Sequence, residues 1–323
     1  MSILKKIEVF FMAMLCFLFA SGCSEQKKPD MKTAKVKEMD LSLYRESKPA
    51  KMMRLLFIHH SCGGLWLADK GEAREIVPNT CLFDFHPEGG GLRTMLMRNN
   101  YEVHEAGYNS LIGDKTDVCD WNMKFRDKMD DILRCDRQDL LYTDPSKKND
   151  IVMFKSCFPA NAIEAEGEEP GNPDSPEKTM ANYKAAYTKL LDYFRAQPNT
   201  LFVCVTAPPL IEKYAGRFAE LKSKFFAPER GAKAVGERAR SFNNWLKDAE
   251  NGWLAGYKLK NVVVFDLYDV LTGNGVSNYA IYPTDNGRDS HPSAEGNAIA
   301  AREFVPFLNR AVNRFLESQT DLR

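Results

Sequence analysis

The sequence lacks an excess of charge of either sign, because Lys plus Arg and Asp plus Glu each number 44. Proteins that recruit nucleic acid or an anionic membrane surface generally carry a strong positive field. The chain also lacks the G-x-G-x-x-G and Walker spacings of nucleotide sites and the C-x-x-C pairs of zinc sites. We therefore expect no nucleic acid, no cofactor and no metal, and a substrate or ligand that is small or neutral.

Long apolar segments are also scarce. The run from Val9 to Ala20 spans about a dozen residues, short of the roughly 20 that a membrane-spanning helix needs. It follows two lysines and leads into Ala20-Ser21-Gly22-Cys23, which is the layout of a secretory signal. The small residues before Cys23 resemble the lipobox of bacterial lipoproteins. That resemblance implies a signal peptide over residues 1–23, acylation of Cys23, and attachment to the envelope outside the cytoplasm, at the outer membrane or periplasm.

The rest of the chain is predicted to form a tether and one large domain. Residues 24–51 are mainly polar and charged, so we interpret them as a flexible tether. Residues 52–318 suit a single domain, and 319–323 form a tail. Short apolar runs alternate with helical patterns, which predicts an α/β fold with a mainly parallel five-stranded sheet between two helical layers. The runs are Arg54 to His59, Tyr101 to Glu105, Ile151 to Ser156, Leu201 to Thr206 and Val262 to Leu267.

Apart from Cys16 and Cys23, six cysteines remain, at positions 62, 81, 119, 135, 157 and 204. An even number in an oxidising compartment favours disulfides, but the sequence leaves their pairing open. Cys62 and Cys157 follow strands directed at the same sheet edge, so a bridge between them is one possibility. Cys204 lies inside an apolar run and is equally well explained as a buried free thiol.

Ser61 stands where the first strand ends and a helix can begin. Such a turn lifts a side chain out of the sheet and leaves backbone N–H groups ready to hold an oxyanion. A serine in this position is also a common helix cap, so a catalytic interpretation needs a base elsewhere in the chain. His59 and His60 precede it. Because neighbours on a strand point to opposite faces, these two histidines are poorly placed to chelate one ion, and one of them can line the pocket instead.

His291 supplies the base that Ser61 requires. It lies in Asp289-Ser290-His291-Pro292-Ser293, where Pro292 and Ser293 have the character of N′ and N-cap positions before the last helix. A carboxylate two residues upstream can orient the imidazole, so Asp289 is the predicted acid and Asp285 the fallback. After the third strand, Asn161 can donate to a developing negative charge, or it can simply hold the turn after Pro159.

This order of residues resembles the SGNH hydrolases, also called the GDSL family, over about Met52 to Phe315. The resemblance implies a flavodoxin-like α/β/α sandwich and cleavage of esters without a metal. It assigns Ser61 as nucleophile, Asp289 and His291 as acid and base, and Asn161 as an oxyanion donor. The family also has a glycine after the second strand, which matches Gly113 or Gly107, and we favour Gly113. The backbone N–H of Ser61 completes the predicted oxyanion hole.

Three departures from the family pattern are visible. His59-His60 replaces the usual Gly-Asp before the serine, Asn161 lacks the Gly-x-Asn-Asp setting, and only Ser290 separates Asp289 from His291. Proteins that acetylate alginate resemble this shorter spacing. The sequence therefore predicts a serine esterase for short acyl groups, such as O-acetyl groups on carbohydrate. The alternatives are an O-acyltransferase to sugar hydroxyls and a non-catalytic carbohydrate-binding lipoprotein.

Overall fold

The computed structural model describes residues 36–213 and 231–320. The predicted signal peptide, the lipidation site Cys23, the first part of the predicted tether (24–35) and residues 321–323 of the tail lie outside these ranges. Within them, no helix combines the length and the apolar character needed to cross a membrane. The last helix runs to Thr320, two residues into the predicted tail.

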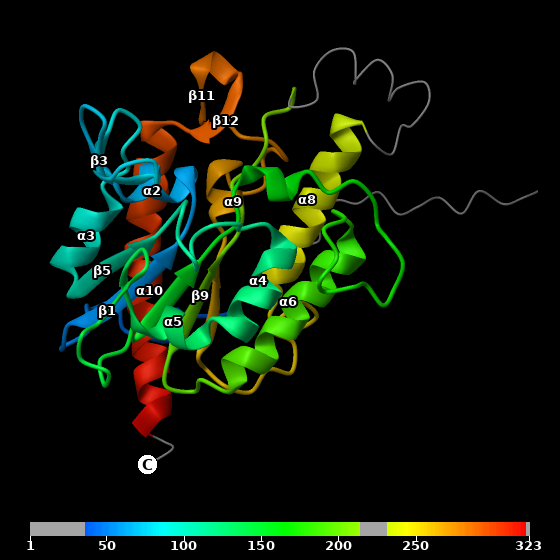
Figure 1. Cartoon of the computed structure of the whole chain (residues 1–323). Coiled ribbons are helices and arrows are strands. Elements are labelled where there is room, and N and C mark those ends of the chain that lie inside the picture. Colours follow the sequence, from blue (N-terminus) through cyan, green and yellow to red (C-terminus); the bar gives the residue numbers. More distant parts are fainter. Residues whose placement is uncertain (1–35, 214–230, 321–323) are drawn as a thin grey trace, which may run out of the picture. The chain divides into compact units, whose positions relative to one another are not determined.

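A mainly parallel sheet forms the centre of the described domain, which confirms the predicted fold class (Figure 1). The strand order is β10 (Val262–Phe265), β9 (Leu201–Val205), β8 (Ile151–Phe154), β1 (Met53–Ile58), β5 (Tyr101–Ala106), β6 (Cys135–Arg137) and β7 (Leu140–Leu141). The five predicted strands are all present. The predicted number is too low by two, because β6 and β7 are only 3 and 2 residues long, too short to give a recognisable strand pattern. Only the β6–β7 pair is antiparallel in this sheet.

Helices cover both faces of the sheet, because side chains along each strand alternate between the faces. On β1, Leu55 and Phe57 join one buried apolar cluster and Leu56 and Ile58 join the other. The first cluster packs under α2 (Ser61–Leu67), α3 (Leu92–Arg98), α9 (Leu267–Leu271) and α10 (Ala294–Thr320). The second packs under α4 (Val118–Asp127), α5 (Met129–Arg134), α6 (Met180–Arg195) and α8 (Ala232–Lys247). The result is a three-layer α/β/α sandwich.

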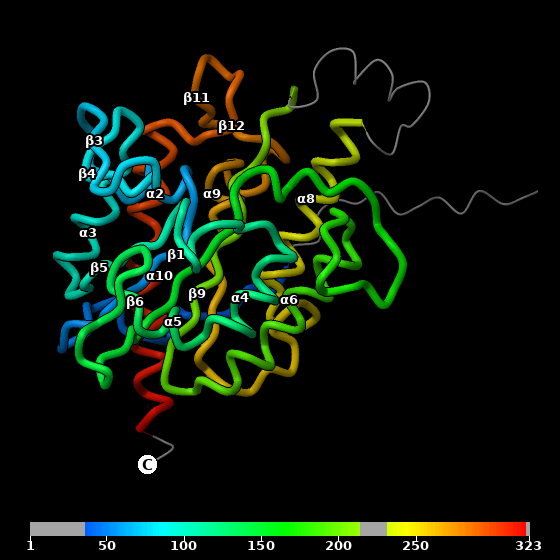
Figure 2. The backbone as a smooth tube through the Cα atoms, viewed as in Figure 1, coloured from blue at the N-terminus to red at the C-terminus, as the bar shows by residue number. Residues whose placement is uncertain are grey.

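Small elements gather where α2 begins, at the carboxyl edge of the parallel strands (Figures 1 and 2). A second sheet has the order β2 (Asp69–Lys70), β4 (Leu82–His86) and β3 (Arg74–Val77). A hairpin pairs β11 (Pro283–Thr284) with β12 (Asp289–Pro292), and the short helices η1 (Phe158–Asn161) and η3 (Asp285–Gly287) follow β8 and β11. These insertions surround the sheet edge at which parallel α/β folds bind ligands.

The compact unit begins at Val36, earlier than the sequence predicts. Residues 36–51 were assigned to the flexible tether, but Leu41 is 8% exposed and belongs to the first apolar cluster. The Asn313 side chain on α10 donates to the carbonyls of Arg45 and Ser47. The polar composition of this segment misled the prediction, because a few well-placed contacts fix it to the domain.

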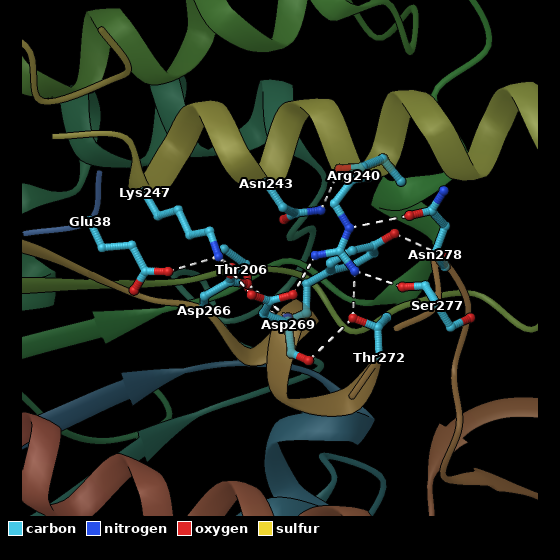
Figure 3. A network of polar contacts seen from close by, with 12 residues as sticks. Glu38, Thr206, Arg240, Asn243, Lys247, Asp266, Asp269, Thr272, Ser277 and Asn278 are labelled. Atoms are coloured by element: carbon cyan, nitrogen blue, oxygen red, sulfur yellow. Dashed lines mark hydrogen bonds and ion pairs between the residues drawn. The ribbon is translucent and has the colours of Figure 1, made fainter. Parts of the chain in front are cut away.

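A network of largely buried charges joins α8 to the start of α9 (Figure 3). The Lys247 ammonium lies 2.8 Å from an Asp266 carboxylate oxygen, 2.7 Å from Asp269 and 3.0 Å from Glu38. The Arg240 guanidinium pairs with Asp269 and donates to the Thr272 hydroxyl and the Ser277 carbonyl. Glu38 comes from the N-terminal segment, so the network also helps to attach that segment to the domain.

Candidate active site

Close packing determines the position of Ser61. It is the first residue of α2, directly after His60, whose extended backbone connects the end of β1 to the helix. A Cβ atom on Gly64 would lie 1.9 Å from the carbonyl oxygen of Cys81, so only glycine lets the helix approach the β3–β4 loop this closely. The buried side of α2 holds Trp66 and Leu67 against the sheet. This packing leaves the Ser61 side chain at the edge of the sheet.

The β11–β12 hairpin brings His291 to the serine. Ser61 Oγ lies 2.8 Å from His291 Nε2, and His291 Nδ1 lies 2.8 Å from Asp289 Oδ1. Because the carboxylate accepts the proton of Nδ1, Nε2 is left as the acceptor for the Ser61 hydroxyl. The buried Ser290 hydroxyl accepts from the backbone N–H of Ile211 and anchors the residue between the two.

Asp289, and not the fallback Asp285, contacts the imidazole. Burial raises the pKa of Asp289, but hydrogen bonds from the backbone N–H and ring of His291 outweigh this effect and leave the pKa below its ordinary value. The carboxylate is therefore ionised at neutral pH and can stabilise an imidazolium. Asp285 is mostly exposed and pairs with Arg288. The one-residue spacing is sufficient, because Asp289 Oδ1 contacts both the ring Nδ1 and the backbone N–H of His291, at 2.8 and 3.1 Å.

The structure does not bring the two other predicted oxyanion donors to the serine. The backbone N–H of Gly113 donates to the Ser110 hydroxyl at 2.8 Å, inside its own turn. The alternative, Gly107, donates to the Gln138 side chain at 2.7 Å. The Asn161 amide donates to the carbonyls of Ala207 and Pro208, at 2.9 and 2.8 Å.

In this structure neither donor is directed at Ser61, so the geometry gives no support to the predicted oxyanion role of Gly113 and Asn161. Asn161 is 1% exposed, and its oxygen accepts from Asn243 on α8, so the side chain joins loops beneath the site. The turn interpretation of Asn161 was closer to what the structure shows. Gly113 is required for another reason, since a Cβ there would lie 2.1 Å from the Gly107 carbonyl oxygen.

Ser61 and His291 open into a cavity of about 400 Å³. Its wall combines charged, hydroxyl and aromatic side chains, as expected of a site for a polar ligand. The lining residues are His60, Ser61, Tyr108, Lys115, Thr116, Asp117, Asp120, Cys157, Phe158, Pro159, Lys178 and His291. A larger cavity of about 540 Å³ lies against Glu38, Lys247 and α10, but none of the residues of the serine–histidine pair lines it.

His60 lines this cavity, and contacts with three neighbouring groups fix its ring. Its ring stacks on Tyr108 with centroids 3.8 Å apart, Nε2 lies 3.0 Å from the Gly113 carbonyl, and Nδ1 lies 3.1 Å from the Thr116 hydroxyl. Since a carbonyl only accepts, Nε2 carries the proton and Nδ1 accepts from Thr116. Burial lowers the pKa of His60 to about 4, so the ring is neutral at physiological pH.

Tyr108 is a site residue that sequence reasoning missed. It follows β5 at the same sheet edge as Ser61 and lines the same cavity. Burial raises the pKa of Tyr108, so the hydroxyl keeps its proton and remains a donor. Its position directly after the second predicted strand indicates a site residue, because the carboxyl ends of parallel strands meet at one edge of the sheet.

His59 faces the other way and supports the turn. Its Nδ1 lies 2.9 Å from the His60 carbonyl, and its Nε2 lies 3.1 Å from the Glu105 carboxylate, which also pairs with Arg93. The two histidines therefore point to different partners, as expected for neighbours at a strand end.

The predicted disulfides are absent, because all six described cysteines are free thiols. Cys135 donates to the Gln138 carbonyl, and Cys204 is buried within β9, as its free-thiol interpretation predicts. Cys62 and Cys157 do approach each other, with sulfurs 3.2 Å apart. Cys157 also lies 3.8 Å from Ser61 Oγ.

Comparison with known proteins gives likenesses of fold alone. No family model and no curated protein matches the sequence. Among solved structures, the chain is similar to a protein from Bacteroides fragilis described as a putative acylhydrolase, at 12% identity and TM-score 0.38 over 81% of this chain and 91% of that one. It is similar to an acetyl xylan esterase from the rumen bacterium Butyrivibrio proteoclasticus, at 14% identity and TM-score 0.38 over 83% and 66%. A catalytic mutant of an acetylxylan esterase from Geobacillus stearothermophilus gives 15% identity and TM-score 0.38 over 82% and 96%.

These neighbours are acylhydrolases and carbohydrate esterases by description. With identities of 12 to 15% and TM-scores of 0.38, their chemistry does not transfer to this chain. The chemistry open to Ser61 follows from the geometry around it.

Proposed function

We propose that the protein is a serine esterase of the SGNH type that hydrolyses short acyl esters. The observation that carries this proposal is the continuous chain from Ser61 Oγ through both ring nitrogens of His291 to Asp289, with 2.8 Å at each contact. A serine hydroxyl is a weak nucleophile until a base accepts its proton, and this chain supplies a base with its orienting carboxylate.

In the proposed mechanism, His291 takes the Ser61 proton as Oγ attacks the ester carbonyl. Asp289 stays ionised and stabilises the imidazolium. The imidazolium then protonates the leaving alcohol. Water, deprotonated in turn by His291, releases the acyl group from the serine.

The oxyanion is assigned to donors at the start of α2 and to Tyr108. The first N–H groups of a helix have no carbonyl partner within it, so those of Ser61 and Cys62 face the cavity end of α2. The protonated Tyr108 hydroxyl adds a side-chain donor next to Ser61. This set replaces the glycine and asparagine of the family pattern.

The cavity favours a small acyl group on a polar alcohol. A volume of about 400 Å³ with Lys115, Asp117, Asp120 and Lys178 in its wall suits a hydroxylated partner better than a long acyl chain. We therefore propose O-acetyl groups on carbohydrate as the substrate class.

Hydrolysis of p-nitrophenyl acetate by the protein from Ser24 onward tests the reaction. Ser61→Ala and His291→Ala should each lower kcat by about 10³-fold or more. Ser146→Ala, an exposed serine ahead of β8 at the opposite end of the sheet, should leave kcat unchanged. Wild-type protein that is folded but gives no turnover would refute the esterase.

We further propose export and lipid anchoring through Cys23, on the strength of the signal layout and the small residues before it. Radiolabelled palmitate should label the wild-type protein in the cells that make it, and Cys23→Ala should abolish the label. Equal labelling of both forms would remove the anchor from this proposal.

A further inference from the structure

Two cysteines from separate elements meet beside Ser61. Cys62 is the second residue of α2, and Cys157 follows β8 and precedes η1. Strands β1 and β8 are parallel neighbours, with Ile58 opposite Phe154, so the chain leaves both strands at the same edge. Sheet register thus places the two thiols together, although 95 positions separate them in the sequence.

The separation of the sulfurs suits a covalent link. They lie 3.2 Å apart, so they need to close by only roughly 1.2 Å to reach the length of a disulfide bond. Cys81 is a third thiol in this region, in the β3–β4 loop against Gly64 of α2, but the sulfur–sulfur contact that the structure shows is the one between Cys62 and Cys157. The contact between Cys62 and Cys157 therefore indicates one particular pair.

The two thiols differ in accessibility. Cys157 lines the cavity, whereas Cys62 is 1% exposed. A hydrogen bond from Cys62 lowers the pKa of the Cys157 thiol, and burial raises the pKa of the Cys62 thiol. Since the thiolate is the reactive form, Cys157 is the thiol that an incoming reagent meets and Cys62 is the one that acts second.

We propose that Cys62 and Cys157 form an intramolecular disulfide when the protein meets a small-molecule disulfide oxidant. Cys157 attacks one sulfur of the oxidant, which breaks its S–S bond and releases one thiol. Cys62 then attacks the Cys157 sulfur of the mixed disulfide and releases the second thiol. Two protein thiols are oxidised, the oxidant is reduced to two thiols, and the protons of Cys62 and Cys157 end on those products.

The bond has a consequence for the site, which rests on the proposed esterase. In the reduced protein, the Cys157 sulfur lies 3.8 Å from the Ser61 hydroxyl and 3.2 Å from the Cys62 sulfur. An ionised sulfur this close to the serine repels the negative charge that develops on an oxyanion. A disulfide sulfur cannot ionise, so the oxidised protein is the better esterase.

Peptide mapping of the purified protein after incubation with oxidised glutathione tests the bond without any assay of activity. The wild type should give one bridge, between Cys62 and Cys157. Cys62→Ala should trap glutathione on Cys157, whereas Cys157→Ala should leave Cys62 unmodified. Cys119→Ala, which removes a half-buried thiol on α4, should still form the bridge. Two free thiols after oxidation, a bridge to Cys81, or equal trapping by both single variants would overturn the proposal.

Wild-type protein with and without a reductant gives a second test that needs no variant. Oxidation should raise the Tm by roughly 5 to 10 °C, because the bond closes a loop of about 95 residues. It should also raise kcat for p-nitrophenyl acetate by about tenfold. An unchanged or lower Tm contradicts the bond, and a lower kcat contradicts its effect on the oxyanion. No turnover in either redox state would count against the esterase alone, since the peptide map and the Tm still decide the disulfide.

Discussion

At the scale of single residues, the site contains two kinds of side chain. Some take part in the proposed chemistry, and others stabilise the turns around it. Asn161 belongs to the second kind, because all of its polar atoms are used by Ala207, Pro208 and Asn243. Tyr108 belongs to the first kind, because it lines the cavity into which Ser61 opens and its ring stacks on His60. The resemblance to a family assigns an oxyanion role to Asn161 and no role to Tyr108.

Asn161→Ala and Tyr108→Phe distinguish these roles. Asn161→Ala should lower the free energy of unfolding by about 2 to 4 kcal/mol, since it leaves two buried carbonyls without a donor, while kcat of the folded protein stays within about twofold. Tyr108→Phe keeps the ring that stacks on His60 and should lower kcat by about tenfold at unchanged stability. Urea titration and p-nitrophenyl acetate kinetics measure both. A large fall in kcat for folded Asn161→Ala would restore its predicted oxyanion role.

His60 links stability to pH. Its pKa is about 4 in the folded protein, whereas an unfolded histidine titrates near 6.5. As the pH falls between these values, the unfolded chain binds a proton that the folded chain does not, so stability is lost on acidification and gained as the pH rises. The loss attributable to His60 between pH 7 and pH 4 should be about 2 to 3 kcal/mol, allowing for partial solvent screening.

The measurement is the free energy of unfolding from urea titrations at pH 4 to 7, for wild type and His60→Asn. The variant should show a shallower dependence on pH, because it no longer carries the titrating group. Identical slopes for the two proteins would mean that His60 is protonated equally in the folded and unfolded states.

At the scale of elements, the segment 36–51 behaves as part of the domain. Leu41 is buried against α10 and its neighbours at 8% exposure, whereas Leu43, two residues later, is 82% exposed. Leu41→Ala should therefore lower the free energy of unfolding by about 2 to 3 kcal/mol, and Leu43→Ala should change it by less than about 0.5 kcal/mol. Equal effects in thermal or urea unfolding would show that the segment is a tether after all.

The contrast between strand β1 and the segment 36–51 shows which structural features the sequence can predict. Strands β8, β9 and β10 are continuous apolar runs and β1 is nearly so, because they are buried on both faces, and such runs can be recognised without a structure. The motif around His291 is local, so its acid was also predictable. The partners of Gly113 and Asn161 come from Ser110, Ala207 and Pro208, and no spacing rule gives such side-chain contacts. Tyr108 and the Cys62–Cys157 contact depend on which strand ends are neighbours.

At the scale of the whole molecule, the charge network of Figure 3 joins parts that are far apart in the sequence. Lys247 on α8 is 7% exposed and is the cation shared by Glu38, Asp266 and Asp269. Burial raises the pKa of Asp266, and the attraction of Lys247 offsets this effect only in part. The ionised carboxylate is therefore less favourable here than it is in water. Removing one partner of a buried pair leaves an uncompensated charge, whereas removing both leaves none.

Lys247→Met should therefore lower the free energy of unfolding by about 3 to 5 kcal/mol at pH 7. The double variant Lys247→Met with Asp266→Asn should recover part of that loss, because the buried carboxylate becomes a neutral amide. Lys233→Met, which removes an exposed lysine from the same helix, should be close to neutral, because its side chain is 89% exposed. Urea titrations of the four proteins give the comparison. A double variant no more stable than Lys247→Met would show that the unpaired charge of Asp266 is not the cause, and that Lys247 acts through Glu38 and the N-terminal segment instead.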